Sequence, residues 1–426
     1  MRRLIFVEAN TTGTGMLAIR TARRLGLDPV FLTNRPERYG GLGEAAPEVI
    51  VCETNEPAEL SAVLRRLGRD RLAGVTTTSE FYLGAVAELA ERFGLPGNSP
   101  RAVGRCRNKA RVRQVLDAAG LSTVRFAVVR EPGDLGRALR VTGLPCVVKP
   151  VDDSGSQNVR VCGTAEEAAT QVAVVLAVRA NVRGQASAGL ALVEEYVPGP
   201  EFSVELFGGS LVGVTEKAVT PAQCLEWRHV YPADVDHRKA VAVAGRALES
   251  VGVRYGPSHV EVKIADGRVE IIEINNRLAG GMIPELIRLV DGVDLLEAQL
   301  RYAAGLPARE AVVTSDRPGY AGIQFLTAGR AGVVEEIAGA GEARRMPGVA
   351  QVSVTGRPGM TAGEPRSAYD RLGFVIATGV SRAQVLDRLA AAAGRITVRS
   401  RAVSSPAPGR PILEGAAPPL GTLCSP

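Results

Sequence analysis

The chain has 426 residues, of which 46% are hydrophobic, 4% are aromatic and 23% are charged, and its formal net charge is +6. A chain of this length is expected to hold about three domains with sizeable apolar cores. The basic residues are dispersed, without a Lys/Arg run or an interleaved aromatic stripe. This pattern argues against a nucleic-acid partner and fits phosphorylated or carboxylate substrates better.

The six cysteines are widely spaced and form no CxxC or Cys/His pattern, so the sequence indicates neither a zinc site nor a disulfide framework. The first apolar run, residues 4–7, ends at Glu8 and is too short for the hydrophobic region of a signal peptide. No stretch approaches the length of a membrane span. We therefore expect a cytoplasmic protein without a membrane partner.

The first 98 residues alternate short apolar strands with helices. Strands are predicted at 4–7, 30–33, 49–52 and 74–78, and helices at 16–25, 59–67 and 81–93. This alternation predicts a Rossmann-like α/β domain, in which a small parallel sheet carries helices on both faces.

A glycine-rich turn follows the first strand. The segment Gly13–Ala18 matches the dinucleotide pattern GxGxxG/A between a strand and a helix. The acid expected to bind a ribose is missing after the second strand, although Arg35 could meet a 2′-phosphate. An NADP-binding module without ligase activity is therefore one alternative. The other is a turn that directs helix N–H groups toward a different anion.

Beyond Asn98 the predicted elements are longer helices and paired strands. Helices are predicted at 101–120, 131–142 and 165–180, and strands at 124–129, 145–148, 159–162, 190–193, 202–207 and 211–215. The strand at 145–148 delivers Lys149 to a polar loop that contains Ser154, Gly155 and Ser156. A lysine opposite a Gly/Ser loop suits a phosphate clamp, with a point charge on one side and backbone N–H groups on the other. A surface hairpin with one lysine is the alternative.

Residues 260–274 are predicted to form a β-hairpin around the turn Asp266-Gly267. Glu273 and Asn275 share one face because they are two residues apart in a strand, and Glu261 can join them from the neighbouring strand. Three hard oxygen ligands on a rigid platform suit Mg²⁺ or Mn²⁺. The alternative is a solvated hairpin, but carboxylates between isoleucines are costly to bury unless they are occupied.

Two glycines, Gly280 and Gly281, precede a helix that is predicted to begin near Pro284, a favoured first helical residue. Their N–H groups and the helix N-terminus could hold a substrate carboxylate. A helix entry that needs small residues for packing explains the glycines equally well.

The remainder, after Gly305, is mostly β. Strands are predicted at 319–326, 333–337, 349–354, 373–377 and 396–398, with one helix at 385–393. Residues 403–426 are rich in Pro, Ala and Ser and are predicted to be a disordered tail.

The order of these segments, from about Leu4 to Arg401, resembles that of the ATP-grasp enzymes. The resemblance implies that Lys109 and Lys149 are the two lysines that contact phosphate. It also implies that the loop with Ser154, Gly155 and Ser156 is the small lid over the phosphates.

The same resemblance implies roles for the other charged positions. The segment Glu194-Glu195-Tyr196-Val197 resembles the hinge whose backbone meets adenine, and Glu201 resembles the acid that binds the ribose hydroxyls. In the hairpin, the residues that resemble the family's metal ligands are Glu261, Glu273 and Asn275. Arg277 resembles the arginine that steadies a carboxylate or acyl phosphate. The run IEINNR departs from the commoner IEINPR at Asn276, which is not a ligand in the family pattern.

Two further segments resemble particular branches of the family. Residues 226–232 resemble the substrate loop E-x-x-H-x-x-P of the amino-acid-ligase branch, in which His229 could contact a substrate carboxylate or amine. A capped loop histidine is the alternative. The segment 373–398 resembles the end of the biotin-carboxylase-like ATP-grasp enzymes.

The resemblance implies a carboxylate–amine ligase that uses ATP and Mg²⁺ (or Mn²⁺) to join an amino acid or a related acid to an amine. The route would be an acyl phosphate, with Lys149 and Arg277 as catalytic residues. The implied partners are a small-molecule carboxylate and a small-molecule amine. The chain could also form a homodimer. The rival is a biotin-carboxylase-type enzyme, which activates bicarbonate. The chain holds no Met-Lys-Met carrier sequence, which argues weakly against that rival.

The expected architecture combines α/β and α+β parts. A Rossmann-like domain is expected over residues 1–98, an ATP-grasp domain over 99–305, a small β-rich C-terminal subdomain over 306–402, and the tail over 403–426.

Overall fold

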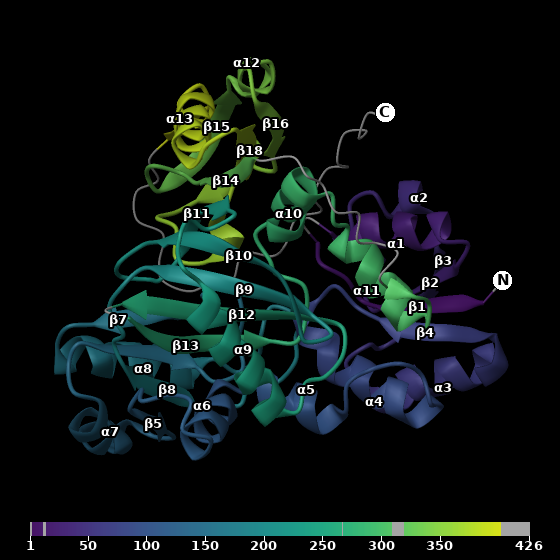
Figure 1. Ribbon diagram of the computed structural model, residues 1–426, viewed down its shortest axis with the longest axis horizontal. Coiled ribbons are helices and arrows are strands. Elements are labelled where there is room, and N and C mark those ends of the chain that lie inside the picture. The colour runs from purple at the N-terminus through teal and green to yellow at the C-terminus, as the bar shows by residue number, and fades with distance from the viewer. Residues whose placement is uncertain (1, 12–13, 266, 309–318, 402–426) are drawn as a thin grey trace.

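A computed structural model describes residues 2–11, 14–265, 267–308 and 319–401, and the structural statements below refer to these residues. The predicted turn residue Asp266, the predicted tail and Gly13 of the glycine-rich turn lie outside them. The chain forms three lobes (Figure 1), with the N-terminal lobe in purple and blue, the middle of the chain in teal, and the C-terminal elements in green and yellow.

The N-terminal lobe is built on a four-stranded parallel sheet, as predicted. Its strands, in the order β3-β2-β1-β4, are β1 (Arg3–Val7), β2 (Asp28–Thr33), β3 (Glu48–Val51) and β4 (Leu72–Thr76). Its helices are α1 (Gly15–Arg24), α2 (Leu42–Ala45), α3 (Pro57–Leu67) and α4 (Leu83–Phe93). Alternate residues of β1 enter two separate cores: Leu4 and Phe6 pack on one face of the sheet, and Ile5 and Val7 on the other.

A helix far along the chain completes one of these two cores. The helix α11 (Leu295–Ala303) places Leu296 and Leu300 in the cluster that contains Leu4 and Phe6. The helix approaches β4 so closely that a Cβ on Gly74 would lie 1.8 Å from the Ala303 carbonyl oxygen. Residues at the end of the predicted ATP-grasp domain therefore cover the sheet of the N-terminal lobe.

A second sheet is antiparallel and follows two short helices, α5 (Pro100–Cys106) and α6 (Lys109–Ala118). Its strands, in the order β5-β8-β6-β7, are β5 (Phe126–Val129), β6 (Cys146–Pro150), β7 (Arg160–Cys162) and β8 (Ala191–Glu195). The helices α7 (Leu135–Thr142) and α8 (Ala165–Ala177) pack against it. Because β6 ends at Pro150, Lys149 lies inside the strand, whereas the sequence pattern placed it directly after the strand. Glu194 and Glu195 likewise lie in β8.

The largest sheet has eight antiparallel strands in the order β13-β12-β9-β10-β11-β14-β18-β16. They are β9 (Glu201–Phe207), β10 (Ser210–Val219), β11 (Glu226–Tyr231), β12 (Pro257–Ala265), β13 (Arg268–Asn275), β14 (Tyr320–Leu326), β16 (Val349–Val354) and β18 (Gly373–Gly379). A three-stranded sheet, β17-β15-β19, adds β15 (Gly332–Ala338), β17 (Thr361–Ala362) and β19 (Thr397–Arg401). The large sheet has strands on both sides of residue 305, where a domain boundary was predicted. This boundary and the other predicted domain boundaries stay predictions.

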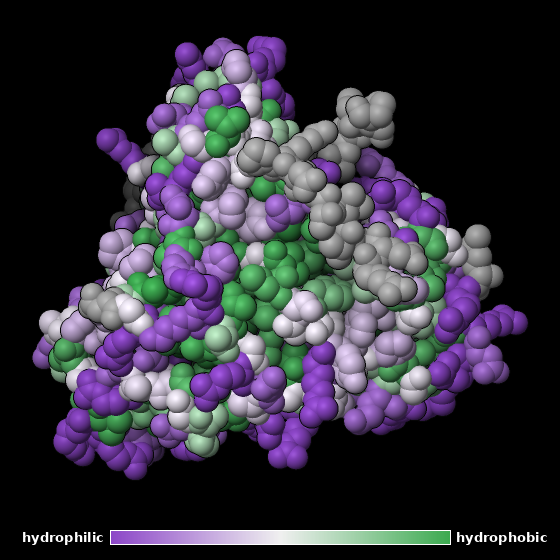
Figure 2. Space-filling model, in the orientation of Figure 1, coloured by the Kyte–Doolittle hydropathy of each residue, from purple (hydrophilic) through white to green (hydrophobic). Residues whose placement is uncertain are grey.

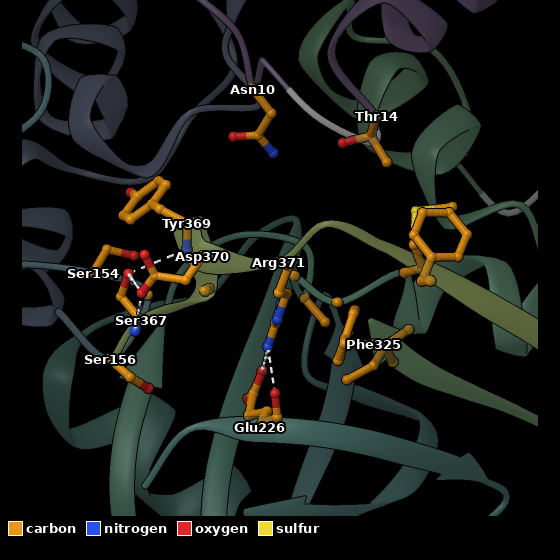
Figure 3. Close-up of a pocket in the computed structure, with 18 of the residues that line it drawn as sticks. Asn10, Thr14, Ser154, Ser156, Glu226, Phe325, Ser367, Tyr369, Asp370 and Arg371 are labelled. Atoms are coloured by element: carbon orange, nitrogen blue, oxygen red, sulfur yellow. Dashed lines mark hydrogen bonds and ion pairs between the residues drawn. The ribbon is translucent and has the colours of Figure 1, made fainter. Parts of the chain in front are cut away.

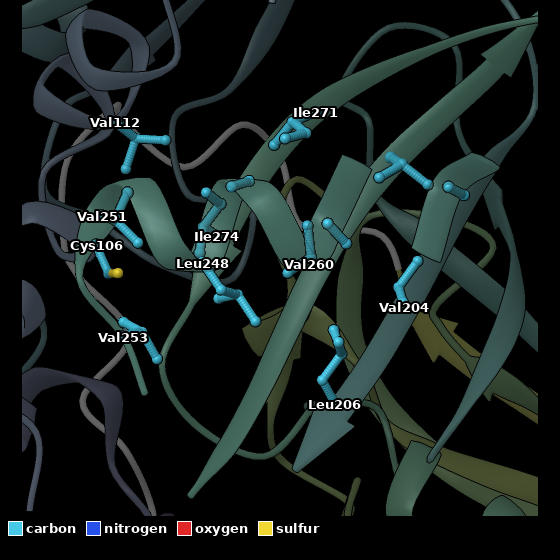
Figure 4. Close-up of a cluster of buried hydrophobic side chains, with 14 of the residues drawn as sticks. Cys106, Val112, Val204, Leu206, Leu248, Val251, Val253, Val260, Ile271 and Ile274 are labelled. Carbon is cyan, nitrogen blue, oxygen red and sulfur yellow. The ribbon is translucent and has the colours of Figure 1, made fainter. Parts of the chain in front are cut away.

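The remaining helices pack against the large sheet, including the strands from the C-terminal part of the chain. They are α9 (Arg238–Val251), α10 (Ile283–Asp291), α12 (Ala340–Arg344) and α13 (Arg382–Ala393). The hairpin of β12 and β13 packs Val260, Ile271 and Ile274 against Leu248 and Val251 of α9 (Figure 4). The alternation predicted for the first strand is therefore confirmed: Val260 and Val262 enter this core, and Glu261 lines the cleft. In β13 the register shifts opposite Glu261 and Val262, so that Ile272 lies in the cleft beside Glu273.

Hydrophilic side chains dominate the outer edges of the face shown in Figure 2, and hydrophobic ones gather near its centre, where the lobes meet. Within the described parts of the chain, none of the helices has the length and apolar character needed to cross a membrane.

We expect Gly74→Ala to destabilise the protein by about 1–3 kcal/mol, because the added methyl group collides with the backbone of α11. Gly84→Ala in α4 is the matched control. A Cβ there meets nothing within 4 Å, and alanine favours a helix by about 0.5–1 kcal/mol. Urea unfolding midpoints measure both effects, and equal midpoints for the two variants would contradict the close packing of α11 on β4.

Candidate active site

One cleft lies where the three lobes meet, and residues from each lobe line it. Figure 3 shows Asn10 and Thr14 of the N-terminal lobe on one side of the cleft. Tyr369 and Arg371 of the C-terminal region lie opposite them, and Glu226 lies at the base. The predicted phosphate, metal and substrate residues all border this cleft, apart from Asn275 and His229, which are not among the described residues that line it.

The predicted metal platform is formed by the register of β12 and β13. Glu261 pairs with Glu273, and His259 pairs with Asn275. Glu261 lies 2.9 Å from Lys217 Nζ, and Glu273 lies 3.4 Å from Lys109 Nζ. The side chain of Asn275 is buried, and its Nδ2 has no hydrogen-bond partner among the described residues.

The two predicted phosphate lysines approach the cleft from different elements. Lys109 is the first residue of α6, and its Nζ donates to the Asp153 carbonyl at 2.6 Å. Lys149 lies on β6, and its Nζ is 2.6 Å from Glu194 Oε2. Arg113 contacts the other oxygen of the same carboxylate. Burial alone would raise the pKa of Glu194, but Arg113 and Lys149 lower it to about 2.

The predicted phosphate lid is a loop with left-handed backbone at Gly155 (φ +71°) and Ser156 (φ +56°). The Ser156 hydroxyl donates to the Cys224 carbonyl at 3.2 Å. The Gly155 carbonyl accepts from Ala368 N at 3.0 Å. The loop is therefore fixed by a contact with the C-terminal part of the chain, which the sequence did not predict.

The predicted hinge continues β8 toward β9. Tyr196 N donates to the Pro145 carbonyl at 3.1 Å. The Val197 carbonyl accepts from Lys263 Nζ at 2.9 Å, and the Lys263 ammonium lies 4.8 Å from the Tyr196 ring centroid. The backbone of this segment is thus held on both sides, next to the buried Glu201.

Lys217 is the buried centre of the site, and sequence reasoning gave it no role. Its Nζ lies 2.6 Å from Glu226, 2.9 Å from Glu261 and 3.0 Å from Glu201. Burial opposes the charged ammonium, but these three carboxylates raise the pKa of Lys217 well above its usual value. Burial also raises the pKa of Glu201, whereas Lys217 and His229 hold the pKa of Glu226 well below its usual range, against the effect of burial.

A second missed residue, His259, lies beside the predicted metal platform. Its Nδ1 lies 2.7 Å from Glu205 and its Nε2 lies 3.1 Å from Glu261. The sequence interpretation found no partner for this histidine. Its position two residues before Glu261, on the same face of one strand, was the available signal. Burial opposes the imidazolium, but the two carboxylates raise the pKa of His259 to about 9.

His229 and Gly281, predicted separately, lie in contact. A Cβ at Gly281 would be 2.4 Å from His229 Cε1, and Gly281 has φ +58°. His229 is buried, its Nε2 is 3.4 Å from Glu226, and its ring meets Phe325 edge to face at 5.5 Å. Burial lowers the pKa of His229, which favours the neutral ring. Gly281 is therefore explained by packing, while Gly280 faces open space and α10 begins as predicted, with Pro284 in its first turn.

Glu80 is a third missed residue. Arg277 donates to its Oε2 through Nε at 2.9 Å and Nη2 at 2.6 Å. The two residues are 197 positions apart, so no local spacing could have connected them. The one available signal was the place of Glu80 shortly after the carboxyl end of β4, where parallel α/β sheets bind ligands.

The glycine-rich turn of the N-terminal lobe has a steric explanation at Gly15, the first residue of α1. A Cβ there would lie 2.1 Å from the Asn10 carbonyl oxygen. Thr14, which precedes it, lines the cleft. Thr14 thus borders the same cleft as the predicted phosphate and metal residues.

Three family models match successive parts of the chain. They are an ATP-grasp N-terminal domain over residues 19–97, an ATP-grasp domain over 142–285, and an L-amino acid ligase C-terminal domain 2 over 324–401.

Relatives extend these matches to most of the chain. A protein described as uncharacterized, y4rH of Sinorhizobium fredii, is 31% identical over 387 residues, which are 90% of this chain and 80% of that protein. Alanine–anticapsin ligase of Bacillus subtilis is 26% identical over 58% of this chain, and carnosine synthase 1 of Gallus gallus is 31% identical over 52% of it. This chain covers only 57% and 26% of those two proteins, respectively.

A solved structure, that of L-amino acid ligase from Bacillus licheniformis, is similar with a TM-score of 0.79 and 22% identity. The similarity covers 94% of this chain and 99% of that one, and it shows a common fold. The chain belongs to the ATP-grasp superfamily, among its carboxylate–amine ligases, and is therefore an enzyme that forms C–N bonds.

We expect the charge of Glu194 to stabilise the protein above pH 4.5. Its pKa of about 2 lies below the ordinary value of 4.5, so this stabilisation is lost as the pH falls from 4.5 toward 2. Glu194→Gln should lower the free energy of unfolding by up to about 3 kcal/mol near neutral pH, and by progressively less below pH 4.5.

Denaturant unfolding across pH 2–7 measures this difference. The control is Glu195→Gln, because Glu195 pairs with Arg125, whose side chain is 58% exposed, and such a surface pair contributes at most about 1 kcal/mol. A cost for Glu194→Gln that does not change with pH would contradict the assignment.

Proposed function

We propose that this enzyme joins an amino acid, or a related acid, to an amine by way of an acyl phosphate, and releases ADP and phosphate. The observation that carries the proposal is the arrangement of one cleft. Two lysines and a Gly/Ser loop lie on one wall of it, and a carboxylate hairpin with Arg277 lies beside them. Groups suited to phosphate and an arginine suited to a carboxylate thus line one cleft, which supports the proposal.

The nucleotide would lie along the second sheet. Lys109 and Lys149 would contact phosphate oxygens, and the loop with Ser154, Gly155 and Ser156 would cover them. The backbone of the hinge, Glu194-Glu195-Tyr196-Val197, would meet adenine, with the Glu201 carboxylate near the ribose. The ion pair of Lys149 with Glu194 supports this placement, because it holds the lysine at the cleft wall.

The hairpin residues fit a divalent metal ion. Glu261 and Glu273 pair in register and line the cleft, and Asn275, two residues after Glu273, is buried. Among the described residues, no three His, Cys, Asp or Glu side chains are grouped to hold a metal ion. Glu261, Glu273 and the amide oxygen of Asn275 would hold the ion with few protein ligands, which suits Mg²⁺ because it keeps several positions for water and phosphate. The bound ion would neutralise charge on the transferring phosphoryl group.

The acid needs activation because a carboxylate has no good leaving group. Arg277 would orient the carboxylate, and Lys149 would neutralise phosphoryl oxygens in the transition state, so that catalysis rests on positioning and charge. The N–H groups of Gly280 and Gly281, which line the cleft, would border the substrate, and the neutral ring of His229 would lie behind Gly281. None of these steps requires a covalent intermediate on the protein.

The test is a search for the activated acid. The enzyme is incubated with MgATP and a panel of amino acids, singly and in pairs, with and without hydroxylamine. We expect phosphate release that depends on an acid, a hydroxamate when hydroxylamine replaces the amine, and ADP in step with the amide. AMP and pyrophosphate would contradict the acyl phosphate. Turnover that needs bicarbonate and biotin, and no amine, would select a carboxylase instead.

We expect Glu273→Gln to reduce turnover by at least about tenfold to a hundredfold, because it removes the charge of a metal ligand and keeps its shape. A second readout does not need turnover: the Mg²⁺ concentration that gives half of the thermal stabilisation by ADP should rise. Glu336→Gln, at a side chain that is 54% exposed, is the control. A wild-type Mg²⁺ requirement in Glu273→Gln would place the metal elsewhere.

A further inference from the structure

Glu80 joins parts of the site that come from different lobes. It is the first residue of a 3₁₀ turn after β4, Glu80–Tyr82, and is only 8% exposed. Its Oε2 accepts hydrogen bonds from Arg277 and, at 2.6 Å, from the Ser154 hydroxyl. Its Oε1 contacts Arg107. One oxygen atom thus holds both the arginine proposed for the acid and the loop proposed for the phosphates.

Arg107 strengthens the same connection. Its Nη2 donates to the Asp152 carbonyl at 3.0 Å, at the start of the phosphate loop. Burial alone would raise the pKa of Glu80, but Arg277 and Arg107 hold it well below its usual range. The carboxylate is therefore ionised, and the loop is tied to it at two points.

Glu80 lies behind Arg277 as seen from the cleft. Arg277 is among the residues that line the cleft, whereas Glu80 is not among the described residues that do so. Arg277 also donates through Nη1 to the Leu278 carbonyl at 3.0 Å. Because a guanidinium group has five N–H donors, these three bonds leave two for a group in the cleft. Glu80 can therefore hold Arg277 without competing for its ligand.

We propose that Glu80 is a positioning residue that sets the distance between Arg277 and the phosphate loop. The inference rests on the proposed function, in which Arg277 holds the acid and the loop holds the γ-phosphate. Transfer requires the acid oxygen to lie in line with the phosphorus atom, and a misplacement of about 1 Å can cost roughly a hundredfold in rate. Glu80 would maintain that alignment from outside the reaction centre.

The test variant is Glu80→Gln, which keeps the size of the side chain but loses its charge and turns an NH₂ group toward donors. With the acid–amine pair that the panel identifies, we expect kcat to fall about tenfold to a hundredfold, with little change in the Kd for MgADP. The number of ADP molecules formed per amide should rise, because the phosphoryl group is transferred to water when the acid is misaligned. Glu88→Gln, at an exposed position of α4, is the control and should behave like the wild type.

A double-mutant cycle with Arg277→Ala separates positioning from a general structural effect. If Glu80 acts through Arg277, Glu80→Gln should have little further effect on kcat in the Arg277→Ala background. An undiminished fall in that background, or a wild-type kcat and ADP-to-amide ratio in Glu80→Gln alone, would overturn the proposal. Ser154→Ala, which removes only the loop contact, replaces Glu80→Gln if that variant does not fold.

A measurement without turnover distinguishes failure of this inference from failure of the proposed function. Hydrogen exchange of residues 152–158 is followed with MgADP bound. Faster exchange in Glu80→Gln than in the wild type is expected, even if no acid–amine pair supports turnover. Equal exchange would show that Glu80 does not hold the loop, whatever the reaction proves to be.

Discussion

The arrangement of the site depends on one buried ammonium group. Lys217 is 4% exposed and is surrounded by the carboxylates of Glu201, Glu226 and Glu261, which come from three other strands of the large sheet. Isolated charges are very costly to bury, so each of these groups needs the others. One cation does not neutralise three anions, and two further cations complete the cluster. Arg371 Nη2 lies 3.3 Å from Glu226 Oε2, and His259 Nε2 lies 3.1 Å from Glu261 Oε1.

The charges also explain why three lobes are needed. The carboxylate of Glu80 comes from the N-terminal lobe and Ser154 from the loop of the second sheet, while Arg277 follows the last strand of the hairpin. The C-terminal region contributes Arg371, which donates to the Glu226 carbonyl at 2.8 Å and stacks on Phe325 at 3.5 Å from the ring centroid. Buried polar groups of one lobe thus find their hydrogen-bond partners in another lobe.

The fold could be predicted well where the signal is local. The strand 260–265 alternates with the period of a strand, and Glu273 and Asn275 are two residues apart, so the sequence pattern correctly predicted Glu261 opposite Glu273. It did not predict the register shift next to Glu261. The parallel sheet of the N-terminal lobe followed from alternating strands and helices. In contrast, the packing of α11 on that sheet, the contact of Ala368 with Gly155, and the pair of Glu80 and Arg277 join residues far apart in the chain. Ordinary apolar or charged residues make these contacts, and their local sequence does not identify a partner.

The central claim is that the acid receives the γ-phosphoryl group before the amine attacks. The fate of a carboxylate oxygen tests this claim directly. With a substrate acid whose carboxylate is labelled with oxygen-18, the account predicts that one labelled oxygen per turnover appears in inorganic phosphate, as measured by mass spectrometry. Label found in AMP, or phosphate released without label during amide formation, would contradict it.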